Sequence, residues 1–173
     1  MQNLIESLLH FSEACSLNEP LQKINLNAVL KQLKPEFGLL SQETTEGIID
    51  DPLPTILGNP TQIKQLLQNI LSNAVKFKED DQPPKITITC CLNQQSRWEV
   101  SIKDQGIGFD EIYKNRIFRP FEKLHGQNKY DGTGMGLAIC QKIMENHCGT
   151  INVRSQLGQG AIFTMIFPYQ KDI

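Results

Sequence analysis

The sequence lacks several features that would assign it to a specialised class of protein. Its five cysteines include no CxxC pair and their number is odd, so no disulfide framework is visible. No apolar run approaches the ~20 residues that a membrane span needs, and no charged-then-apolar start indicates a secretory signal. The net charge is only −2, so charge indicates neither nucleic acid nor an anionic membrane as a partner.

The remaining composition is typical of one cytoplasmic, globular domain. The chain has 173 residues, which is enough for a single domain with a real core and short for two. Hydrophobic residues make up 39% and charged residues 21%, as in soluble proteins. We expect the cysteines to be small buried or half-buried side chains in a reducing compartment, and we expect no direct membrane contact.

Hydrophobic periodicity predicts a mixture of helices and strands. Helices are expected at 1–14, 26–40 with an interruption near Pro35, 60–78 and 136–147. Strands are expected at 47–49, 55–57, 85–92, 98–104, 150–155 and 161–167. Residues 16–25 have the composition of a linker, and 105–131 form a long loop with a short helical piece around 110–118. Loops of this length in compact domains are usually functional or mobile.

Capping signals sharpen two of these boundaries. Asn59 followed by Pro60 is a favourable helix start, because Asn caps free N–H groups and proline suits the first helical position. Gly149 is the expected C-cap glycine of the helix at 136–147. The apolar residues of the helix at 60–78 share one face that we expect to be buried: Ile63, Leu66, Leu67, Ile70, Leu71, Ala74 and Phe77.

A polar stripe borders this apolar face. Asn69 and Asn73 are four residues apart and Lys76 is three further on, so all three lie along one side of the helix. Asparagine in the middle of a helix lowers helix stability by roughly 0.5 kcal/mol relative to alanine. Two asparagines one turn apart therefore indicate a role other than helix formation. An amide oxygen is a neutral, hard ligand that suits Mg²⁺ bridging phosphates. The alternative is two ordinary polar surface residues.

An acidic residue ends the strand expected at 98–104. Asp104 shares its parity with the apolar residues of that strand, so its carboxylate should point to the same side. A half-buried carboxylate needs a donor, and the exocyclic amine of adenine is one candidate. Gly106 and Gly108 follow, which would let the backbone approach a flat base. The alternative is a D-x-G turn at a strand end.

Three glycines, Gly132, Gly134 and Gly136, lead into the helix at 136–147. Free N–H groups and the helix dipole make such an end an anion site. The spacing GxGxG differs from the dinucleotide fingerprint GxGxxG, and no strand leads into it, so a Rossmann interpretation fails. The alternative is a glycine-rich hinge.

The segment RIFRPFEKLHG at 116–126 lies within the long loop. We expect Phe118 and Phe121 to anchor this loop rather than to touch a ligand. Lys123 could reach a terminal phosphate, or it is a solvated lysine. Residues 122–133 contain almost no apolar anchor, so we expect low local stability there.

Together these segments resemble the catalytic, ATP-binding domain of sensor histidine kinases, within the superfamily that includes gyrase, the Hsp90 chaperones and MutL. The similar segments are NILSNAVKF (N box), DQGIGFD (G1 box), RIFRPFEK (F box), GTGMGLAIC (G2 box) and SQLGQGAIFTMIFP (last glycine box). The resemblance covers about 25–168, and the boxes occur in the family's order. The sequence of residues 124–151 most resembles that of the phytochrome-type branch of the family.

The resemblance implies an α+β fold, a two-layer α/β sandwich in which a mixed sheet of about five strands packs on three helices. It also implies ATP and Mg²⁺ as ligands. Asn73 would ligate Mg²⁺, and the catalytic positions would be Asn69, Lys76 and Lys123. The implied nucleotide-contacting positions are Asn73, Asp104, Gly106, Gly108, Phe118, Gly132, Thr133, Gly134, Met135, Gly136 and Leu137.

The implied activity is donation of the γ-phosphoryl group of Mg-ATP to a histidine, for onward transfer to an aspartate of a response-regulator receiver domain. His10, His125 and His147 lack the family's acceptor context, so we expect the acceptor on a helix outside this chain and little activity of the chain alone. Residues 1–16 resemble the end of the dimerisation and phosphoacceptor hairpin, 17–25 a linker, and 26–170 the catalytic domain. A homodimer through that hairpin is implied.

Two other functional classes remain as alternatives. The first is a nucleotide-binding regulatory module without chemistry, which the intact boxes disfavour. The second is a gyrase-type ATP hydrolase. Hydrolysing relatives carry a Glu four residues before the Mg²⁺-binding Asn, and Asn69 stands there instead, which favours phosphoryl transfer to a protein group. Ala161 stands where the last box usually has Thr or Ser, a departure we expect to be peripheral.

Overall fold

The computed structural model describes residues 9, 11–12, 20–37, 48–49, 52–79, 82–124 and 132–168. Most of the helix expected at 1–14 lies outside these ranges, and so does the segment 125–131, with His125. The expectations for both segments therefore stay predictions.

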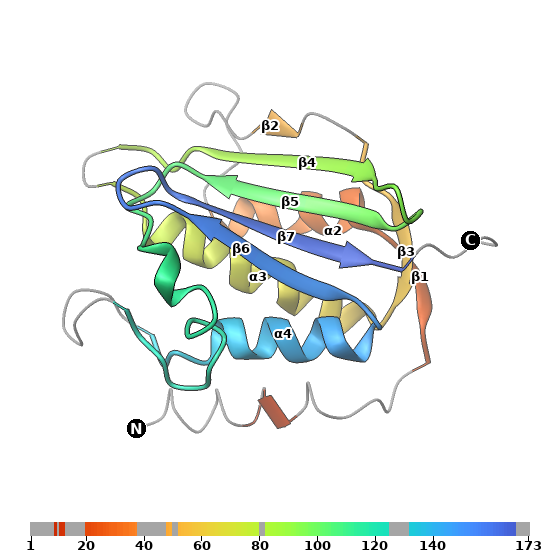
Figure 1. Ribbon diagram of the computed structural model, residues 1–173. Helices are drawn as coiled ribbons and strands as arrows, with labels where there is room; N and C mark the ends of the chain where they lie inside the picture. The colour runs from red at the N-terminus through yellow and green to blue at the C-terminus, as the bar shows by residue number, and fades with distance from the viewer. Residues whose placement is uncertain are drawn as a thin grey trace.

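Five strands form the main sheet, in the order β2-β4-β5-β7-β6. They are β2 (Ile48–Ile49), β4 (Ile86–Leu92), β5 (Trp98–Asp104), β6 (Thr150–Ser155) and β7 (Ala161–Phe167). β2 runs parallel to β4, whereas the other neighbours are antiparallel, so the sheet is mixed. α2 (Leu26–Leu33), α3 (Pro60–Lys76) and α4 (Gly136–Asn146) lie against one face of it (Figure 1). The predicted two-layer α+β fold is confirmed.

The long helix α3 begins where its capping signals predict. The side-chain oxygen of Asn59 accepts a hydrogen bond from the backbone N–H of Gln62 at 3.1 Å, and Pro60 fills the first helical position. The apolar face from Ile63 to Ala74 is buried as expected. Phe77 was wrongly assigned to that face: it follows the end of α3, is only half-buried, and lines the cavity described below.

One strand was missed from the sequence. β1 (Gln22–Asn25), within the stretch interpreted as a linker, pairs antiparallel with β3 (Thr55–Gly58). This strand has only one fully buried side chain, Ile24, so its hydrophobic pattern is too weak to mark it. Asn25 then caps α2 by accepting hydrogen bonds from the first-turn N–H groups.

The interruption expected near Pro35 is confirmed, because the chain turns after α2 into a 3-10 helix, Lys34–Phe37. Two other helix boundaries differ from expectation. The helical piece expected around 110–118 is a single 3-10 turn, Glu111–Tyr113. At the end of α4 the left-handed residue is Cys148, with φ 53°, rather than the predicted Gly149. Position 149 requires glycine for a steric reason instead, because a Cβ there would lie 2.6 Å from the carbonyl oxygen of Ile166.

Candidate functional site

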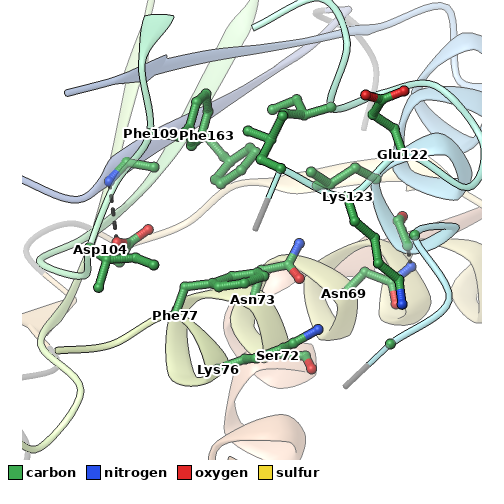
Figure 2. A pocket seen from close by; sticks show the side chains of 18 of the residues that line it. Asn69, Ser72, Asn73, Lys76, Phe77, Asp104, Phe109, Glu122, Lys123 and Phe163 are labelled. Atoms are coloured by element: carbon green, nitrogen blue, oxygen red, sulfur yellow. Dashed lines mark hydrogen bonds between the residues drawn. The ribbon is translucent and has the colours of Figure 1, made fainter. Parts of the chain in front are cut away.

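A cavity of about 310 Å³ opens between α3, the start of α4 and the loop that follows β5. Figure 2 shows Asp104 at one end and Asn69 with Lys123 at the other. The lining residues are Asn69, Ser72, Asn73, Lys76, Phe77, Asp104, Ile107, Gly108, Phe109, Ile117, Glu122, Lys123, Leu124, Gly132, Thr133, Gly134, Gly136, Leu137, Ala161 and Phe163.

The acidic end of this cavity is built by β5 and β7. Asp104 is 7% exposed, and its Oδ1 accepts hydrogen bonds from the backbone N–H groups of Gly106 at 2.9 Å and Ala161 at 3.2 Å. Burial raises the pKa of Asp104, and the hydrogen bonds from the backbone oppose that rise. With Oδ1 held by two backbone donors, Oδ2 is the atom left to meet a donor from a ligand.

Close backbone contacts explain the glycines that follow Asp104. A Cβ on Gly106 would lie 2.2 Å from the carbonyl oxygen of Phe77, which accepts a hydrogen bond from the Ile107 N–H at 2.9 Å. A Cβ on Gly108, whose φ is +58°, would lie 2.1 Å from the carbonyl oxygen of Gln156. The turn after β5 is thus tied both to the end of α3 and to the β6–β7 turn, which fixes the floor of the cavity.

The polar end is built on the stripe predicted along α3. Figure 2 shows the Asn73 amide directed into the cavity, with Ser72 and Lys76 beside it. Asn69 is engaged differently, because its Nδ2 donates a hydrogen bond to the carbonyl oxygen of Gly136 at 3.2 Å and so links α3 to the first residue of α4. Burial raises the pKa of the adjacent Cys140 thiol to about 12, which leaves it protonated at neutral pH.

The glycine turn meets both α3 and the loop 116–124. Within the described residues, the N-cap of α4, Met135, makes no side-chain cap hydrogen bond, and Gly136 and Leu137 line the cavity there. Gly134, with φ +74°, accepts a hydrogen bond from the Phe121 N–H at 3.1 Å, and a Cβ on it would lie 2.8 Å from the Glu122 carbonyl oxygen. A Cβ on Gly132 would lie 2.7 Å from Nζ of Lys76. These contacts place N–H groups and two lysines around one end of the cavity.

Most of the site residues named from the sequence line this one cavity, and three do not. Met135 is buried in the core at 1% exposure, and Phe118 packs against the core, as its anchoring role predicted. Gly106 supports the floor without lining the cavity. The backbone N–H of Ala161 donates a hydrogen bond to Asp104, and Ala161 forms part of the cavity wall. The expectation that its missing hydroxyl is peripheral stays a prediction.

Nine lining residues were not named as site residues from the sequence. Some had a usable signal: Ser72 falls on the Asn69–Asn73–Lys76 stripe, and Glu122 precedes Lys123. The apolar ones carried none, because an apolar residue that lines a pocket has the same pattern as one in the core. The nine are Ser72, Phe77, Ile107, Phe109, Ile117, Glu122, Leu124, Ala161 and Phe163.

Among the residues that the structure describes, no helix has both the length and the apolar character needed to cross a bilayer.

A cavity with a buried carboxylate at one end, and amides, lysines and a helix N-terminus at the other, has the polarity that an adenine nucleotide requires of its site, and it lies on a two-layer α+β fold. Residues 58–171 match the HATPase_c family, described as histidine kinase-, DNA gyrase B- and HSP90-like ATPases. The chain belongs to this family and is an ATP-binding catalytic domain of the sensor histidine kinase type.

Relatives of two kinds support this assignment. The chain is 43% identical to cyanobacterial phytochrome A of Nostoc sp. over 171 residues, and this alignment covers 97% of the chain and 22% of the relative. It is 32% identical to the adaptive-response sensory kinase SasA of Synechococcus elongatus, over 95% of this chain and 42% of the relative. The chain thus spans less than half of either curated relative. The similarity to a phytochrome agrees with the resemblance seen in the sequence of residues 124–151.

Solved structures show the same fold. Full-length ShkA in complex with AMPPNP superposes with a TM-score of 0.76 at 29% identity, covering 95% of this chain and 35% of that one. The catalytic domain of histidine kinase ThkA superposes with a TM-score of 0.69 at 28% identity, covering 87% of this chain and 96% of that one.

Proposed function

We propose that the cavity holds Mg-ATP with its adenine at Asp104 and its phosphates at the α3–α4 end. The observation that carries this proposal is the polarity of the cavity: a buried acceptor at one end and cationic or N–H donors at the other. Oδ2 of Asp104 would accept from the adenine amine. Lys76, Lys123 and the first-turn amides of α4 would meet phosphate oxygens.

The residues present fit a magnesium ion. The Asn73 amide enters the cavity from α3, and an amide oxygen is a suitable ligand for a hard cation that shares its coordination with phosphates and water. Asn73 would hold the ion, with Asn69 adjacent. A bound Mg²⁺ would supply charge neutralisation at the phosphates.

Phosphoryl transfer to a protein side chain fits the site better than hydrolysis. Asn69 stands where a hydrolase of this superfamily carries a general base, and its amide is committed to the Gly136 carbonyl oxygen. An amide cannot take a proton from water at neutral pH. The chain's own groups would therefore orient ATP and neutralise its charge, while a histidine nitrogen attacks the γ-phosphorus and the bond to the β–γ bridging oxygen breaks to release ADP.

The parts of this reaction beyond the domain are also proposals. The acceptor histidine would lie on a helix outside this chain, because the flanks of His10, His125 and His147 do not match the family's acceptor motif. Residues 1–16 would end the dimerisation hairpin, the residues between them and β1 would link it to the catalytic domain, and the protein would be a homodimer. A response-regulator receiver domain would take the phosphoryl group in the cytoplasm.

Calorimetric titration tests the binding step. The chain should bind ATP more tightly with Mg²⁺ than with EDTA, and Asn73→Ala should remove most of that difference. Asn152→Ala is a matched control, because Asn152 is an exposed amide on β6 outside the cavity lining. Equal Mg²⁺ dependence in the wild type and in Asn73→Ala would refute the proposed role of Asn73, and absence of ATP binding would refute the proposed function.

A further inference from the structure

Glu122 is a carboxylate on the wall of the cavity, at the end opposite Asp104, where the other polar groups are suited to anions. It lines the cavity next to Lys123, and its side chain is only 22% exposed. A carboxylate beside the phosphates of a nucleotide would repel them through poorly solvated space. An acid at this place therefore needs a partner that cancels its charge.

Arg116 is that partner. Its guanidinium forms a hydrogen-bonded ion pair with the Glu122 carboxylate and lies 5.2 Å from the ring centroid of Tyr113. Its backbone N–H donates to the Tyr113 carbonyl oxygen at 2.8 Å, which holds it on the turn that follows the 3-10 helix. Arg116 itself does not line the cavity, so it can act on a ligand there only through Glu122.

The backbone makes the two consecutive side chains diverge. Phe121 has the left-handed φ of 65°, a strained conformation for a bulky residue, and its N–H donates a hydrogen bond to the Gly134 carbonyl oxygen. Figure 2 shows the next two side chains leaving in opposite directions: Lys123 runs toward Asn69 on α3, and the Glu122 carboxylate turns away from it. Strain of this kind persists where the surrounding contacts enforce it.

We propose that Arg116 is a positioning residue that draws the Glu122 carboxylate outward and neutralises it, so that the phosphate end of the cavity stays electropositive. The inference rests on the proposed function and deepens it, because it assigns a charge selectivity to the same site. Its effect should grow with the negative charge of the nucleotide. Since the pair is partly exposed, its effect should also shrink as salt screens it.

The test is a set of calorimetric titrations with Mg-ATP, Mg-ADP and adenosine at low and high salt. Arg116→Gln should lower the affinity for Mg-ATP about two- to fivefold at low salt, the range expected for a partly exposed charge. It should lower the affinity for Mg-ADP less and leave the affinity for adenosine unchanged. Arg116→Lys should keep most of the ATP affinity. Arg119→Gln removes the same charge from an exposed position of the same loop and should leave the ATP-to-adenosine preference unchanged.

Glu122→Gln distinguishes two explanations of the ion pair: neutralisation of the Glu122 charge, and a purely structural role in holding the loop. It breaks the same ion pair, yet it should not weaken Mg-ATP, and the double variant Arg116→Gln/Glu122→Gln should regain the affinity that Arg116→Gln loses. If Glu122→Gln weakens Mg-ATP as much as Arg116→Gln does, or if adenosine is affected equally, the inference is wrong. Normal Mg-ATP binding by every variant would refute this inference alone, whereas absence of ATP binding by the wild type would refute the proposed function itself.

Discussion

Oδ1 of Asp104 accepts a hydrogen bond from the backbone N–H of Ala161 at 3.2 Å, although 57 residues separate the two in sequence. A second N–H, from Gly106, binds the same oxygen at 2.9 Å. Burial nevertheless raises the pKa of Asp104, so desolvation of the charge outweighs these two hydrogen bonds. Ionisation of Asp104 therefore disfavours the folded state, and a hydrogen-bond donor from a ligand would offset that cost.

Asp104→Asn should consequently change binding and stability in opposite directions. The new amide oxygen can keep both backbone hydrogen bonds, but an N–H would face the adenine amine, and losing a charged hydrogen bond costs ~1.5–3 kcal/mol, about a ten- to hundredfold loss of affinity. Without a buried charge, the free protein should be more stable. Calorimetry and urea unfolding measure the two effects. Unchanged ATP affinity would contradict the adenine role.

The same variant gives a pH test with a definite sign. A carboxyl whose folded pKa lies above its unfolded value of 3.8 favours folding most when protonated, and this contribution is lost as pH rises through the folded pKa. The stability advantage of Asp104→Asn over the wild type should be largest at neutral pH and should shrink as pH falls toward 3.8. An advantage that grows in acid would show that burial does not dominate.

Substitution of Gly106 and of Gly158 by alanine should affect ATP binding differently, because a close backbone contact requires the first glycine and a left-handed φ the second. A Cβ on Gly106 would lie 2.2 Å from the Phe77 carbonyl oxygen, a backbone atom, so Gly106→Ala should shift the floor of the cavity and weaken both folding and ATP binding. Gly158 has φ +75° but nothing within 4 Å, so Gly158→Ala should cost only about 1–2 kcal/mol of backbone strain and keep the ATP affinity. Equal losses of affinity would contradict the contact with Phe77.

Thiol labelling should separate the cysteines by burial. The expectation of buried or half-buried cysteines is wrong for Cys91 and Cys148, which are exposed, whereas Cys140 is fully buried and burial raises the pKa of its thiol to about 12. Since the thiolate is the reactive species, the native chain should be modified at Cys91 and Cys148 within minutes and at Cys140 only on unfolding. Peptide mass mapping over time provides the measurement, and early labelling of Cys140 would show that the α3–α4 contact opens.

Cys148 offers a gain in stability. It adopts φ 53° just after α4, a conformation that costs a non-glycine residue about 1 kcal/mol and costs glycine almost nothing. Cys148→Gly should therefore raise the free energy of unfolding by up to ~1 kcal/mol, less the entropy that glycine adds to the unfolded chain. Cys148→Ala should bring no such gain. Urea midpoints that fall in both variants would contradict the strain at this position.

The sequence predicted the elements with strong periodicity and clear caps. α3 was located by its Asn59–Pro60 start and its apolar face, β4 and β5 by alternation, and β6 and β7 by their position on either side of the turn QLGQG. The short β1 could not be found this way, because a four-residue strand with a single buried side chain has almost no pattern. Cys148 was missed because glycine is the usual left-handed residue, and Gly149 stood next to it.

The polar part of the site was also visible in the sequence, but its connections were not. The Asn69–Asn73–Lys76 stripe follows from helical spacing, and the inward face of Asp104 from strand parity. Nothing local showed that Asn69 would donate to the Gly136 carbonyl oxygen or that the Ala161 N–H would reach Asp104, because both contacts join distant segments. The ion pair of Arg116 with Glu122 and the left-handed conformation of Phe121 were not predicted either, because no residue pattern marks them.

The most direct test of the account is phosphoryl transfer from ATP labelled in its γ-phosphate. The chain would be mixed with Mg²⁺ and, in trans, with the helical hairpin of the same protein that we propose carries the acceptor histidine. The account predicts acid-labile, base-stable label on the hairpin, none on His10, His125 or His147, and none anywhere with Asn73→Ala. Rapid label on the chain itself, or fast release of phosphate to water without the hairpin, would contradict it.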